Sequence, residues 1–200
     1  MMCLWISPFG LERFTSLTQR CVLRLAAISL VLIAPLSGCQ RASTTSEADS
    51  RPRVLTTFTV LGDLAGMVAG DRLQVDSIVR PGAEIHGYQP TPSDIERASG
   101  ADLIVENGLG LELWARRFTA AAGDVPSVTL TDGIEPLLIS EDVYSGKPNP
   151  HAWMSPQRAM VYVDRLVEAF TRLDPEGAST FEANARAYKE ELRQLDDELR

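Results

Sequence analysis

The chain has 200 residues, of which 19 are lysine or arginine and 27 are aspartate or glutamate, so its formal net charge is −8. A chain this acidic is a poor candidate for binding nucleic acid or an anionic lipid surface, whereas its charge suits a cationic ligand. The sequence contains no Gly-x-Ser-x-Gly, His-Glu-x-x-His or Cys-x-x-Cys motif and no glycine-rich phosphate loop, so nothing in it indicates an enzyme.

The segment 1–38 has the pattern of a secretory signal peptide. Its apolar core, residues 25–36, is about 12 residues long, which is shorter than the roughly 20 that a membrane-spanning helix requires. Leu36-Ser37-Gly38-Cys39 follows and matches a lipobox. We therefore predict that the signal ends at residue 38 and that Cys39 becomes the lipidated first residue; a signal that is cleaved without lipidation is the alternative.

Residues 39–53 are rich in serine, threonine, alanine and charge, and they show no periodicity. This composition predicts a flexible tether between the lipid anchor and the folded domain. Cys3 and Cys21 fall in the predicted signal, so no disulfide can form within the mature chain. The sequence thus predicts a periplasmic or otherwise extracytoplasmic protein that is attached to a membrane through its lipid.

From residue 54 onward, short strand patterns alternate with helical patterns. Because each strand needs a crossover to return, this order predicts an α/β lobe with a parallel sheet over residues 54–173. The expected strands are 54–60, 73–79, 101–106 and 127–130, and the expected helices between them are 61–69, 91–99 and 110–122. Residues 132–150 carry turn residues and little regular pattern.

Two helices are expected at the C-terminal side of the chain. Ser155-Pro156 is a typical helix start, and Asp174-Pro175 ends that helix and begins another. Apolar residues in the second helix recur at alternating steps of four and three: Phe181, Ala185, Tyr188, Leu192, Leu195 and Leu199. We expect this stripe to be exposed, with a coiled-coil dimer seam as the competing interpretation.

The chain has only two histidines, and each lies on a proline-framed loop after a predicted strand and before a helix start. His86 precedes Thr91-Pro92-Ser93-Asp94, the pattern of a capping box, and His151 precedes Ser155-Pro156. Loops that leave the carboxyl ends of parallel strands usually hold the ligand, and neutral imidazole is the commonest metal ligand. The two histidines can therefore meet at one edge of the sheet, where metal binding is one interpretation. On the residues alone, a solvent-exposed or hydrogen-bonded loop histidine is the more frequent case.

Three motifs carry a resemblance to a known family: Pro-Gly-Ala-Glu-Ile-His86-Gly-Tyr-Gln-Pro-Thr-Pro, Glu106-Asn-Gly-Leu-Gly-Leu-Glu-Leu-Trp114 and Gly146-Lys-Pro-Asn-Pro-His151-Ala-Trp-Met-Ser-Pro. They resemble the periplasmic metal-binding proteins of manganese, zinc and iron ABC importers. The resemblance implies two α/β lobes joined by a long helix, of which this chain has the first lobe and, over residues 174–200, the start of the helix, with the second lobe absent. It also implies that His86 and His151 are metal ligands and that two further ligands belong to the second lobe.

The resemblance further implies a receptor that delivers its metal to an ABC permease in the cytoplasmic membrane. Zinc relatives commonly carry a histidine-rich acidic loop, which this chain lacks, so the resemblance favours Mn²⁺, with Zn²⁺ or Fe²⁺ as alternatives. It assigns no coordination to Glu84 or Glu106, which we expect to be solvated or structural. A surface lipoprotein used in adhesion or scaffolding, without metal transport, is the alternative function.

Overall fold

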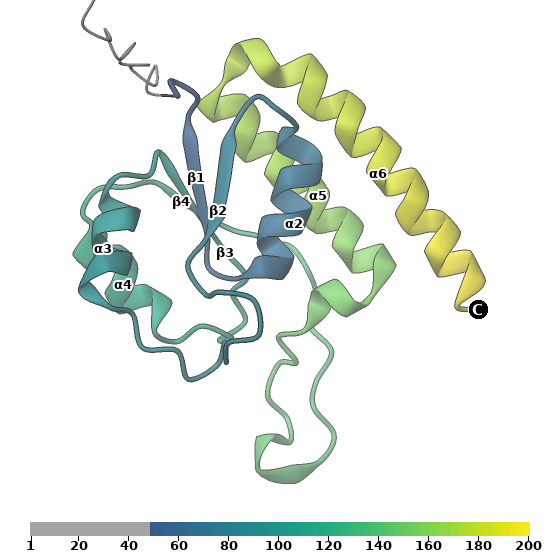
Figure 1. The fold of residues 1–200 in the computed structure, drawn as a ribbon. Coiled ribbons are helices and arrows are strands. Elements are labelled where there is room, and N and C mark those ends of the chain that lie inside the picture. Colours follow the sequence, from purple (N-terminus) through teal and green to yellow (C-terminus); the bar gives the residue numbers. More distant parts are fainter. Residues whose placement is uncertain (1–48) are drawn as a thin grey trace, which may run out of the picture. The chain divides into compact units, whose positions relative to one another are not determined.

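Four short strands form one parallel sheet at the centre of the described part of the chain, residues 49–200 of the computed structural model (Figure 1). The strands are β1 (Arg53–Thr56), β2 (Gln74–Ser77), β3 (Leu103–Glu106) and β4 (Ser127–Thr129), in the order β2-β1-β3-β4. Every pairing is parallel, which confirms the predicted fold class. β2 and β4 are therefore the two outer strands of the sheet.

The predicted signal over 1–38 and Cys39 lie outside the described residues. The limits predicted for the tether (39–53), the lobe (54–173) and the linking helix (174–200) stay predictions. Within residues 49–200, none of the helices combines the length and the apolar character that crossing a membrane requires.

Helices cover both faces of the sheet (Figure 1). Because side chains alternate along a strand, Val54 and Val105 face one side while Leu55 and Ile104 face the other. The first side is covered by α2 (Thr59–Ala69), α5 (Pro156–Leu173) and α6 (Ala178–Glu198), and the second by α3 (Pro92–Ser99) and α4 (Ala115–Ala122). The result is a three-layered α/β lobe.

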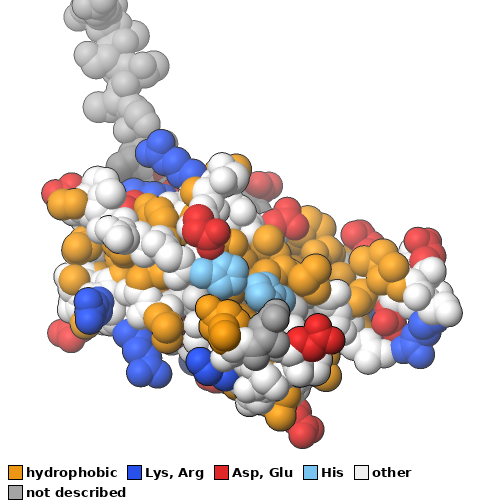
Figure 2. All heavy atoms as spheres, turned by 90° about the horizontal axis from the view of Figure 1, so that it is seen from below, with side chains coloured by type: hydrophobic (Ala, Val, Ile, Leu, Met, Phe, Trp, Pro, Cys, Tyr) orange, Lys and Arg blue, Asp and Glu red, His pale blue; other side chains and the backbone are white. Residues whose placement is uncertain are grey.

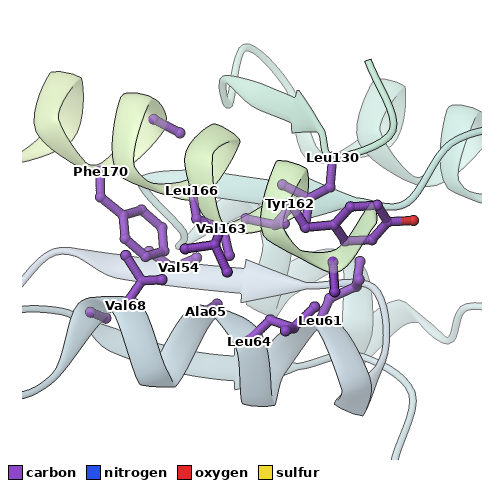
Figure 3. Packing of buried hydrophobic residues seen from close by; sticks show 14 of the residues in the cluster. Val54, Leu61, Leu64, Ala65, Val68, Leu130, Tyr162, Val163, Leu166 and Phe170 are labelled. Atoms are coloured by element: carbon purple, nitrogen blue, oxygen red, sulfur yellow. The ribbon is translucent and has the colours of Figure 1, made fainter. Parts of the chain in front are cut away.

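The larger core lies between α2, the sheet and α5 (Figure 3). Its largest side chains, among them Tyr162, Leu166 and Phe170 of α5, are fully buried. Burying one such side chain stabilises the fold by roughly 1.5–3 kcal/mol. This core therefore contributes much of the stability of the lobe that carries the loops. The residues labelled in Figure 3 are Val54, Leu61, Leu64, Ala65, Val68, Leu130, Tyr162, Val163, Leu166 and Phe170.

The apolar stripe of α6 is covered for most of its length, so the expectation of an exposed stripe was wrong there. Phe181 is fully buried, and its ring meets Phe170 of α5 edge-on at 5.7 Å between centroids. Ala185 and Leu192 are buried as well. The reason is the tight connection η3 (Pro175–Gly177), which folds α6 back onto α5 and α2. Leu195 and Leu199 remain 44% and 68% exposed.

Two predicted boundaries were wrong by more than two residues. The strand expected over 54–60 ends at Thr56, and α2 begins at Thr59, because Phe58 is drawn into the core and Thr57 turns its hydroxyl to a buried carboxylate. The helix expected over 110–122 begins only at Ala115. Gly110, the first residue of the expected helix, has a φ of 79°, a left-handed conformation that a right-handed helix cannot contain.

Candidate metal centre

The carboxyl ends of the four strands meet at one edge of the sheet, and each is followed by a loop that contributes a polar side chain there. Thr57 follows β1, His86 lies in the loop after β2, Asn107 follows β3, and His151 lies in the long loop after β4. Figure 2 views the molecule from below and shows the two imidazoles side by side on the surface, with hydrophobic and acidic side chains close by. This is the edge at which parallel α/β sheets usually hold ligands.

The two histidines face each other through their Nε2 atoms. These atoms are 3.3 Å apart, the ring centroids are 5.4 Å apart and the ring planes are inclined by 51°. The structure thus brings together the two residues that the sequence predicted as metal ligands; their ligand role stays a prediction. Within residues 49–200, no group of three His, Cys, Asp or Glu side chains is arranged to hold a metal ion.

The loop that carries His86 is held by an aromatic pair. The indole nitrogen of Trp114 donates a hydrogen bond of 2.9 Å to the backbone carbonyl of Ile85, the residue before His86. Tyr88 packs on Trp114 with 5.2 Å between centroids, and its hydroxyl donates to the Asp94 carboxylate at 2.9 Å. The chain is therefore held in place on both sides of His86, by Ile85 before it and by Tyr88 after it, although the His86 side chain is 58% exposed.

Asp94 connects this loop to α3 through the capping box that the sequence predicted. The Asp94 carboxylate accepts hydrogen bonds from the backbone N–H and the hydroxyl of Thr91, and Thr91 in turn accepts from the Asp94 backbone N–H. Burial of Asp94 opposes ionisation, but the hydrogen bonds from Thr91 and Tyr88 outweigh it and lower the pKa of this carboxyl. The carboxylate thus fixes the helix start and the end of the His86 loop together.

The loop that carries His151 is held by a buried polar network centred on Asn107. The Asn107 side chain donates to the carbonyl of Pro150, the residue before His151, at 3.0 Å, and it accepts from the Tyr162 hydroxyl at 2.5 Å. Glu112 accepts from the Asn107 backbone N–H at 2.6 Å. Asn107 is fully buried, as is Tyr162. The position of His151 is therefore coupled to the core of the lobe.

Burial shifts the pKa values of several groups in this network. It raises the pKa of Glu112, although hydrogen bonds from Asn107, Thr57 and Gly108 oppose the shift. Burial also raises the pKa of Tyr162, with a further contribution from the charge of Glu112. The pKa of His151 is lowered by burial first and by the nearby His86 second, so the neutral imidazole is favoured there.

The sequence reasoning did not single out Asn107, Glu112 or Tyr162. Asn107-Gly108 directly after a strand could have indicated a turn with a functional amide, but Glu112 lay in a segment expected to be helical, and Tyr162 on a helix face resembles an ordinary core residue. Glu106 was expected to be solvated or structural. Its carboxylate accepts a hydrogen bond from the Thr129 hydroxyl at 2.9 Å.

Fold and site together define an α/β ligand-binding lobe whose two imidazoles converge on one point. Residues 54–200 match the family described as "ZnuA: Zinc-uptake complex component A periplasmic", and the chain belongs to this family, as the motifs predicted. The members of the family are substrate-binding receptors of ABC transporters and not enzymes.

Relatives with established names include the iron-binding protein YfeA of Yersinia pestis, which is 49% identical over 155 residues, 78% of this chain and 50% of the relative. The manganese-binding lipoprotein MntA of Halalkalibacterium halodurans is 36% identical over 171 residues, 85% of this chain and 56% of the relative. The chain thus spans about half the length of these relatives.

Solved structures have the same fold. The Mn-bound periplasmic metal-binding protein of Candidatus Liberibacter asiaticus is 39% identical and superimposes with a TM-score of 0.66, covering 72% of this chain and 54% of the other. Zn(II)-bound AdcA of Streptococcus pneumoniae is 27% identical with a TM-score of 0.66, covering 74% and 32%.

Proposed function

We propose that this chain is the metal-capturing lobe of an extracytoplasmic receptor, anchored to a membrane by lipid on Cys39, that delivers a divalent transition metal to an ABC permease. The observation that carries the proposal is the convergence of the two Nε2 atoms of His86 and His151 at 3.3 Å. The names of the relatives support it, since they bind iron or manganese and several are lipoproteins of metal ABC transporters.

The spacing of the two nitrogens suits one shared metal ion. With metal–imidazole bonds of roughly 2.0–2.1 Å, nitrogens 3.3 Å apart subtend about 105–110° at the ion, which is close to the tetrahedral angle. Metal–imidazole bonds of about 2.2 Å reduce the N–metal–N angle to about 97°, which is closer to the 90° of octahedral coordination. The pair can therefore chelate an ion without rearrangement of the loops, and the spacing is compatible with both geometries.

The two rings alone supply half of a tetrahedral ligand set. The remaining positions of a bound ion are open to water or to oxygen ligands from outside residues 49–200, since no third ligand group stands beside the imidazoles in that part of the chain. Such a site should bind weakly and with little selectivity. By ligand affinity alone zinc would exceed iron and manganese, so selectivity has to come from the ligands that complete the site.

We propose Mn²⁺ as the physiological metal, with Fe²⁺ or Zn²⁺ as alternatives. The chain lacks a histidine-rich loop, and its relatives include manganese-binding and iron-binding proteins. The comparisons do not favour the alternative of adhesion or scaffolding without metal, because the relatives are named for metal binding or metal transport.

Calorimetric titration with Mn²⁺ and Zn²⁺ tests the proposal on the wild type, His86→Ala, His151→Ala and the double variant. Because each single variant keeps only one imidazole, we expect all three to lose binding alike, a non-additivity that marks a shared ligand. Gln89→Ala, an exposed change in the same loop as His86, is the matched control and should bind as the wild type does. If each single histidine variant keeps wild-type affinity, the two residues are not co-ligands and the proposed site is wrong.

A further inference from the structure

Each histidine makes the same pair of contacts with the side chain two residues before it in the sequence. One carboxylate oxygen of Glu84 accepts from the backbone N–H of His86 and lies 2.8 Å from its ring Nδ1. The side-chain oxygen of Asn149 accepts from the backbone N–H of His151 at 3.0 Å and lies 2.9 Å from its ring Nδ1. Two loops that are unrelated in sequence thus hold their imidazoles in the same way.

The shared oxygen determines which ring nitrogen carries the proton. A backbone N–H is always a donor, so the atom that it meets in each case must be an acceptor. For Asn149 this argument identifies the contacting atom as the oxygen of the amide and not its nitrogen. The Nδ1 that meets the same oxygen must therefore donate, and each neutral ring is held as the Nδ1–H tautomer.

The consequence appears at the other nitrogen of each ring. With Nδ1 protonated, both Nε2 atoms of the neutral rings carry lone pairs, and these atoms are 3.3 Å apart. Two facing acceptors cannot hydrogen-bond to each other, whereas a cation between them is stabilised by both. In the opposite tautomer, an Nε2–H group would point at the position of the ion and block it.

We propose that Glu84 and Asn149 are positioning residues that select the metal-binding tautomer of His86 and His151. The inference rests on the proposed function, since metal is what the two lone pairs would bind. Neither residue would touch the ion. Hydrogen bonds to the outer nitrogen of a metal-ligating histidine typically change metal affinity by about 10–100-fold. Because the Glu84 side chain is 72% exposed, we expect a loss near the lower end, about 10-fold, when it is removed.

Glu84 presents a charged carboxylate and Asn149 a neutral amide, so variants can separate the effect of the acceptor oxygen from the effect of the charge. Glu84→Ala and Asn149→Ala remove the acceptor, whereas Glu84→Gln and Asn149→Asp keep an oxygen in place and change only the charge. A role limited to shaping the loop would leave the tautomer unchanged in all four variants. Glu84 and Asn149 lie in different loops, so each histidine serves as an internal control for the other.

The measurement is nitrogen-15 NMR of the imidazoles in the metal-free protein at a pH of about 8, where free histidine is neutral. In the wild type both rings should be Nδ1–H tautomers. In Glu84→Ala the His86 ring, and in Asn149→Ala the His151 ring, should shift toward the Nε2–H form that free imidazole side chains favour. Glu84→Gln and Asn149→Asp should restore the wild-type signature.

Titration of the same variants with Mn²⁺ and Zn²⁺ gives the second measurement. We expect about a 10-fold loss of affinity for each alanine variant and recovery in Glu84→Gln and Asn149→Asp. Unchanged tautomers in the alanine variants would overturn the inference. If the tautomers shift as expected while the wild type binds neither metal, tautomer selection stands and the proposed function fails, so the two failures are distinguishable.

Discussion

Replacement of Tyr162 by phenylalanine tests how much the buried network around Asn107 contributes to the stability of the lobe. The change keeps the ring and removes only the hydroxyl that donates to Asn107 at 2.5 Å. Both residues are fully buried, so the oxygen of the Asn107 amide loses a donor that water cannot replace. An acceptor left unsatisfied in the interior costs about 1–3 kcal/mol of unfolding free energy.

This loss is large enough to measure by urea denaturation. With an m value of about 2 kcal/mol/M, a loss of about 2 kcal/mol lowers the midpoint by about 1 M. Tyr144→Phe is the matched control, because Tyr144 is 58% exposed on the loop before His151, and its variant should lie within about 0.5 kcal/mol of the wild type. If Tyr162→Phe is as stable as this control, the hydrogen bond to Asn107 contributes nothing and the reasoning is refuted.

Two further changes test the loops on either side of the site. Asp94→Asn should lower stability by about 1 kcal/mol at pH 7 by weakening the capping box. Because the pKa of Asp94 is lowered in the folded chain, its stabilisation is fully present above the usual value of 3.8 and is lost progressively as the pH falls below that value. In urea denaturation the difference between wild type and variant should therefore shrink as the pH is lowered from 7 through 3.8 and beyond. Gly108→Ala and Gly82→Ala both place alanine at positive φ, at about 1–2 kcal/mol each, but only at Gly108 would the new methyl group meet the Thr129 and Thr131 side chains. Gly108→Ala should therefore melt well below Gly82→Ala in a thermal scan, and equal melting temperatures would contradict the predicted clash.

The sequence was sufficient to predict the parallel sheet and the convergence of the histidine loops, because both follow from local patterns. The capping box at Thr91 and Asp94 is such a pattern, and the structure confirms it. The β-branched run at Thr56 to Val60 favoured a strand by propensity. Burial of Phe58 at the start of α2 overrode that propensity, which a reading of neighbouring residues cannot anticipate.

The parts of the site that were missed are those that depend on contacts between distant segments. Tyr162 reaches Asn107 across 55 positions of the chain, and Asn107 reaches Pro150 across 43. Asn107 lies in the motif from Glu106 to Trp114, but neither that motif nor the residues around Tyr162 show that the two side chains meet. Asn149 is different, because an oxygen-bearing side chain two positions before each histidine is visible in the sequence itself, and that regularity could have been noticed.

The strand order determines what a metal ion bound by both histidines would do to the lobe. His86 and His151 lie in the loops after β2 and β4, which are the outer strands and share no backbone hydrogen bonds. An ion held by both residues would act as a removable crosslink between opposite margins of the sheet, joining positions 65 residues apart. If the proposed ion binds only the folded form, a free metal concentration of about 100 times the dissociation constant would add about 2.7 kcal/mol to stability. Local unfolding of β2 and β4 would then be coupled and rarer. The rate of amide hydrogen exchange in these two strands would therefore fall as the free metal concentration rises.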